Sequence, residues 1–88
     1  MNIYMLEPNS DLPRRDEKAN PWEPWYDKCF GVVVVAGSEE QARFEASECQ
    51  CGEGKKAWLE SAFSTCKHVG VAIDGIEIGV LIQDVRQA

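Results

Sequence analysis

The side chains best suited to chemistry in this sequence form two short pairs. Cys49 and Cys51 are separated by one residue, as are Cys66 and His68, and fourteen residues lie between the pairs. Thiolates and imidazole bind zinc tetrahedrally, so these four side chains are a candidate zinc site. Structural zinc sites usually leave about two to four residues between paired cysteines, so the spacing departs from the common pattern. Free thiols without a cofactor, which are common in cytoplasmic proteins, are the alternative that we favour.

A catalytic use of Cys66 and His68 is a further alternative. The two residues alternate on a predicted strand and so point the same way, as a thiolate and imidazole pair requires. The sequence offers no orienting carboxylate, no amide-lined oxyanion site and no glycine pattern of a phosphate-binding loop beside them. We therefore expect a protein that is not an enzyme.

Two segments have the composition of binding surfaces. In the first, Pro21-Trp22-Glu23-Pro24-Trp25-Tyr26, two prolines stiffen a run with three large rings, the material of binding hot spots. The alternative for Trp22, Trp25 and Tyr26 is a lid packed on one face of a sheet.

The second segment is a predicted helix from Glu39 to Cys49. Ser38 and Gln41 form a capping box at its start, and its inner stripe consists of Ala42, Ala46 and Cys49. Its outer surface is acidic with an exposed aromatic, and Arg43 can pair with a glutamate one turn away. The outer residues that we expect to contact a partner are Glu39, Glu40, Phe44, Glu45 and Glu48.

The elements around these segments predict an α+β fold in one domain, residues 1–88. Residues 2–6 suit a short strand, such as one at a sheet edge, and a Pro- and Trp-rich loop follows over 8–28. Residues 30–36 are apolar on both faces, which is typical of a central strand. Asp74-Gly75 between two β-branched runs predicts a tight C-terminal β-hairpin. The expected architecture is an antiparallel sheet of about four strands with one helix packed on one face.

The hairpin register also predicts which side chains share a face. It places Val71 opposite Ile78 on a face that belongs to the core, under the helix. Cys66 and His68 then lie on the opposite face, whose side chains are small or polar, away from Cys49. We expect rings of the 8–28 loop to cover part of that face.

Charge and hydropathy restrict the partners. A net charge of −6 repels phosphates, so direct nucleic-acid binding is not expected, whereas a partner with a basic surface is. No apolar run approaches the roughly 18 residues that cross a membrane, and the N-terminus lacks a leader pattern, so we expect a cytoplasmic protein.

Several runs resemble small proteins carried by phages, prophages and other mobile elements. They are Trp25-Tyr26-Asp27-Lys28-Cys29-Phe30-Gly31-Val32-Val33-Val34, Ser38-Glu39-Glu40-Gln41-Ala42-Arg43, Trp58-Leu59 and Ser64-Thr65-Cys66. In size, acidity and layout the chain also resembles several anti-CRISPR proteins, which share no motif, so no functional residue carries over. The resemblance implies a bacterial host cell and stoichiometric binding. Together with the net charge, the size and the absence of a catalytic set, it leads us to expect a non-catalytic inhibitor that is a monomer or homodimer. The implied partner is a host protein or ribonucleoprotein complex.

Overall fold

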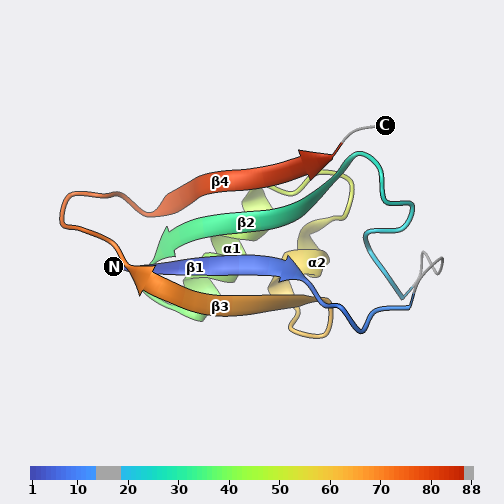
Figure 1. The fold of residues 1–88 in the computed structure, drawn as a ribbon, viewed down its shortest axis with the longest axis horizontal. Coiled ribbons are helices and arrows are strands. Elements are labelled where there is room, and N and C mark those ends of the chain that lie inside the picture. Colours follow the sequence, from blue (N-terminus) through green and yellow to red (C-terminus); the bar gives the residue numbers. More distant parts are fainter. Residues whose placement is uncertain (14–18, 87–88) are drawn as a thin grey trace.

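The computed structural model describes residues 1–13 and 19–86 and contains one four-stranded antiparallel sheet. The elements in chain order are β1 (Asn2–Pro8), β2 (Lys28–Ala36), α1 (Glu39–Glu48), α2 (Lys55–Leu59), β3 (Ser64–Val71) and β4 (Gly79–Arg86). Both helices lie on the same side of the sheet, behind it in the view of Figure 1. The predicted α+β class is therefore confirmed, with the short helix α2 as an addition. No helix within the described ranges is long and apolar enough to cross a membrane.

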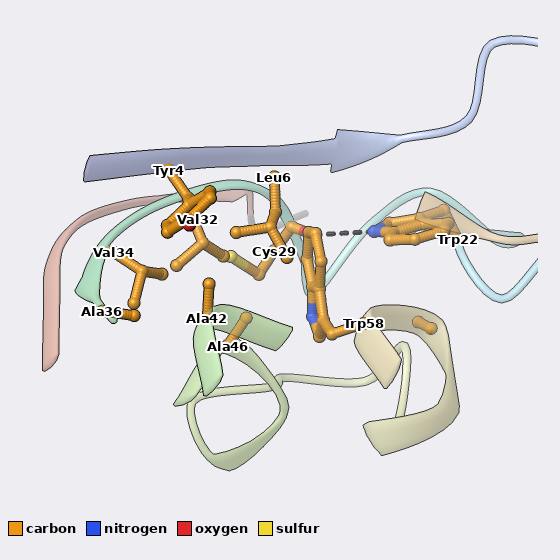
Figure 2. Packing of buried hydrophobic residues seen from close by; sticks show 11 residues of the cluster. Tyr4, Leu6, Trp22, Cys29, Val32, Val34, Ala36, Ala42, Ala46 and Trp58 are labelled. Atoms are coloured by element: carbon orange, nitrogen blue, oxygen red, sulfur yellow. Dashed lines mark hydrogen bonds between the residues drawn. The ribbon is translucent and has the colours of Figure 1, made fainter. Parts of the chain in front are cut away.

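The core lies between the helices and one face of the two central strands. Tyr4 and Leu6 of β1 alternate with more exposed neighbours, and in β2 Val33 between the buried Val32 and Val34 is more exposed, although Val35 is buried as well. Each strand thus turns every second side chain toward the helices. The core is completed by residues from the loop, the strands and the helices (Figure 2), namely Trp22, Cys29, Ala36, Ala42, Ala46, Ala57 and Trp58.

The predicted helix is confirmed as α1. The backbone N–H of Gln41 donates to Ser38 Oγ at 3.2 Å, and Gln41 Oε1 accepts from the N–H of Gly37 at 2.6 Å. The first bond satisfies a donor that the first turn of the helix leaves free, and the second fixes the chain just before the cap. Ala42 and Ala46 face the sheet as expected, and their small side chains let the helix approach it closely.

The predicted C-terminal hairpin is wrong. Asp74-Gly75 does form a turn, and Gly75 has the positive φ of 93° that such turns favour, but β3 and β4 lie at opposite edges of the sheet in the order β3-β1-β2-β4. The connection 72–78 runs around one end of the sheet (Figure 1). Because β3 pairs with β1 and β4 with β2, the two apolar strands both become central, and a ladder protects each of their edges. The expectation of β1 at an edge is wrong for the same reason, while the central position of β2 is confirmed.

Candidate functional site

The acidic side of α1 has no arginine to balance its charge, because Arg43 is turned inward. Arg43 is 7% exposed, and its guanidinium donates to the Trp58 carbonyl and to both oxygens of Ser64, each at 2.9 Å. It also pairs with Glu39 at 3.0 Å, so the predicted contact one helical turn away is confirmed. Arg43 thus ties α1 to α2 and β3, and its charge is not available to balance the outer glutamates.

The outer side of α1 combines carboxylates with an exposed ring. Phe44 is 53% exposed, as predicted, with Glu40 and Glu48 one turn before and after it. Glu45 is half-buried, and Glu48 pairs with Lys55 at 3.2 Å on the surface. The predicted contact residues Glu40, Phe44, Glu45 and Glu48 therefore share one side, whereas Glu39 lies toward Arg43.

The Trp-rich segment divides into one buried and two exposed rings. Trp22 is 3% exposed, contacts the Trp58 ring edge-on at 5.3 Å between centroids, and donates from Nε1 to the Cys29 carbonyl at 2.6 Å (Figure 2). Trp22 therefore belongs to the core and cannot be a contact residue. Trp25 and Tyr26 are 61% and 44% exposed and touch each other, with 6.5 Å between centroids, so these two remain candidates.

The position predicted for this loop is also wrong. We expected its rings over the small and polar side of a C-terminal hairpin, but Trp22 packs against Trp58 of α2 (Figure 2), and Trp25 lies beside Phe30 of β2 and Arg86 of β4. Residues 14–18 of the predicted loop lie outside the described residues. Because β3 and β4 lie at opposite edges, the face predicted from the hairpin does not exist.

The face predicted for Cys66 and His68 is likewise wrong. Cys66 lies opposite Leu6 and His68 opposite Tyr4, so both share the face that the helices cover. Cys66 packs against the core, and the rings of Tyr4 and His68 are 5.5 Å apart. The register that misplaced them came from the hairpin, and a one-residue change of register moves every side chain of a strand to the other face.

The four candidate zinc ligands come from two parts of the fold. Cys49 and Cys51 follow α1, whereas Cys66 and His68 lie on the edge strand β3. Across residues 1–13 and 19–86, no three His, Cys, Asp or Glu side chains are grouped so that they could hold a metal ion. The zinc hypothesis stays a prediction, which elemental analysis of protein purified without chelator would test.

The buried thiols are held in their protonated form. Burial raises the pKa of the Cys66 thiol to about 11, with Glu39 raising it further and Arg43 opposing the shift. Burial also raises the pKa of Cys29 to about 11. A nucleophilic cysteine needs a thiolate near neutral pH, so this environment does not favour catalysis by Cys66.

Sequence reasoning missed a buried carboxylate, Glu53. It is 7% exposed and accepts three N–H groups, from the Trp58 indole at 2.7 Å and from the Cys29 and Cys51 backbones at 3.0 and 3.2 Å. These bonds replace the hydration that the carboxylate loses. Because one donor is 24 residues away, no local pattern marks Glu53 for this role.

Sequence reasoning also missed the second face of the sheet, which we call the open face. Its central residues are Ile3, Met5 and Val33, which are half-buried, and Val35, which is fully buried; at the β4 edge Ile82 is 66% exposed. At one end the face borders a hollow of about 530 Å³, whose lining includes Trp25, Phe30 and Arg86. The presence of one ten-residue helix in the sequence was the available signal, since it can cover one face of a sheet but not two.

Comparison with known proteins gives no assignment. No known protein family, no curated protein and no solved structure matches this chain. Its function must therefore be argued from its own surfaces.

Proposed function

We propose that this chain is a non-catalytic inhibitor that binds a basic protein surface. The observation that carries the proposal is the setting of the exposed aromatics in the described part of the chain. Each of them lies beside carboxylates: Phe44 between Glu40 and Glu48 on α1, and Trp25 with Tyr26 between Glu23 and Asp27 in the loop.

This combination suits a partner rich in arginine. A guanidinium can stack on an aromatic face while its N–H groups bond a neighbouring carboxylate. Lysine can make the same charge contacts less specifically. Aromatic rings with adjacent charges are also the usual residues of binding hot spots. The two surfaces therefore favour a basic protein groove over a neutral one.

The class of partner that we propose is a nucleic-acid-binding host complex in the bacterial cytoplasm, such as a CRISPR effector. Such a complex presents a basic channel to phosphates, and an acidic protein can occupy the channel in their place. A net charge of −6 and the resemblance to anti-CRISPR proteins in size and layout support this choice. Under this proposal inhibition is stoichiometric and requires no cofactor.

Purified CRISPR effector complexes provide the direct test. The chain is titrated against each complex, and binding of the complex to its target DNA is followed by mobility shift. We expect one complex to lose DNA binding at about equimolar chain, with an affinity that falls as salt is raised. The variant E40K/E45K/E48K should lose this inhibition.

The matched control reverses three exposed acids elsewhere, D11K/E60K/E77K, and so changes the net charge by the same amount. The control should inhibit almost as well as the natural chain. Equal losses in both variants would show an effect of overall charge and reject the α1 surface. Failure of the chain to inhibit any effector complex would reject this class of partner.

A further inference from the structure

The open face of the sheet is apolar in the middle and is a natural site for association. Met5 lies directly opposite Val33, and Ile82 lies opposite Val33 on the other side. Ile3 lies opposite Val35 in the next row, which ends in Gly70 at one edge and Gly79 at the other. The helices lie on the far side of the sheet (Figure 1). On this face Ile3, Met5 and Val33 are half-buried, whereas Val35 is fully buried. We infer that two copies of this chain pack together through their open faces.

The charge distribution favours a second copy. The chain as a whole carries a net charge of −6, which makes two copies repel each other. Strand alternation, however, places two acids and two bases on the open face: Glu7, Asp84, Lys67 and Arg86. Lys28, at the start of β2, instead turns its ammonium to the Tyr26 carbonyl at 3.4 Å. The open face is thus close to neutral, and the acidic α1 surface is on the other side of the sheet.

The positions of these charges fit a two-fold axis parallel to the strands. Such an axis places β3 of one copy over β4 of the other, because the two strands form opposite edges of the sheet. Lys67 and Ile82 lie at the same position along the strands, because both are aligned with the Met5–Val33 pair. Asp84 is the next residue of β4 on this face, about 7 Å further along the strand. Asp84 already pairs with Arg86 of its own strand at 3.1 Å, in an exposed pair. Each Lys67 comes within reach of the partner copy's Asp84 and can join this pair, twice in one dimer. An axis across the strands would instead bring the two Lys67 side chains together.

The size of the face sets the expected strength. Four strands about 4.8 Å apart and seven residues long cover roughly 19 by 23 Å, about 440 Å² per copy, which is below the standard size of a specific interface and in the range of weak, reversible ones. Exposed apolar side chains of the adjoining connection, such as Ile76 and Ile78, can enlarge it. We therefore expect a dissociation constant on the order of micromolar. The dimer has helices on its two outer layers and presents two copies of the α1 surface.

Sedimentation equilibrium of the purified chain, from about 1 to 500 μM, measures this association. We expect a reversible monomer-dimer equilibrium that I82D weakens at least tenfold, because the exposed Ile82 becomes a buried charge in the dimer. K67E should also weaken it, whereas the double variant K67E/D84K should restore it by exchanging the two charges. The control K55E makes the same charge change beside the acidic side of α1 and should leave the dimer intact.

Circular dichroism of each variant separates loss of association from loss of folding. A chain that is monomeric up to 500 μM overturns the inference, as does a dimer that folded I82D and K67E leave unchanged. A dimer that K67E weakens but K67E/D84K does not restore rejects the proposed two-fold arrangement. These outcomes are independent of the proposed inhibitor function, because each is measured on the chain alone.

Discussion

The two faces of the sheet differ although neighbouring residues supply them. On β2, Val32 and Val34 are fully buried under the helices, whereas Val33 between them points to the open face and is partly exposed. On the covered side Trp58 fills the space between sheet and helices and Glu53 binds its indole. The covered face forms the core. On the open face Val35 is fully buried as well, while Ile3, Met5 and Val33 stay partly exposed, and these three are the residues that we propose for association.

The largest contrast should come from two tryptophans. Trp58→Ala should lower the free energy of unfolding by about 3 to 5 kcal/mol, because it removes a fully buried ring and leaves Glu53 with one donor fewer. Trp25→Ala removes the same side chain from an exposed position and should change it by less than about 0.5 kcal/mol. Urea unfolding followed by circular dichroism measures both. Similar losses would contradict the assignment of the core.

Two cations give the next contrast. Arg43→Met should lower the free energy of unfolding by about 2 to 3 kcal/mol, since the Trp58 carbonyl and Ser64 lose a buried charged donor. Lys55→Met breaks an exposed pair with Glu48 and should change it by less than about 0.5 kcal/mol. If Arg43 lay on the surface as an ordinary helix pair, the two substitutions would have equal effects in the same urea titrations.

Alkaline pH should lower the free energy of unfolding because two thiols on the covered side stay protonated when folded. Burial raises the pKa of Cys29 and Cys66 from 9.0 to about 11, so above pH 9 the unfolded thiols lose protons that the folded thiols keep. Stability therefore falls as pH rises from about 9 to 11, on the order of 1 kcal/mol per thiol at pH 10. Unfolding at pH 8 and pH 10 should show this fall, and C29A/C66A should show less of it. An equal fall in that variant would assign the effect to other groups.

The last comparison is between adjacent residues on opposite faces of the sheet. Val34→Ala opens a cavity under the helices and should lower the free energy of unfolding by about 2 kcal/mol. Val33→Ala, tested at submicromolar concentration, below the expected dissociation constant of the dimer, should lower it by less than about 1 kcal/mol. At several hundred micromolar the Val33→Ala deficit should grow, because the dimer stabilises the folded chain. A concentration-independent deficit would argue against association through this face.

Local patterns in the sequence were enough to predict the parts of the fold that depend on a few neighbouring residues. The capping pair Ser38 and Gln41 and the spacing of Ala42 and Ala46 predicted α1 correctly. The β-branched run of β2 predicted a central strand, and Asp74-Gly75 predicted a turn. The exposed ring of Phe44 followed from the same helical period. Each of these features depends on bonds or contacts within about four residues.

Only the tertiary structure decided which strands pair and which groups become buried. The turn at Asp74-Gly75 could not show that β3 and β4 would take opposite edges, because strand partners are chosen in competition among segments far apart in the chain. That choice placed Cys66 and His68 on the covered face. The burial of Trp22, Arg43 and Glu53 likewise depends on partners up to 36 residues away. Local periodicity carries no information about contacts of this kind, since packing of the whole domain creates them.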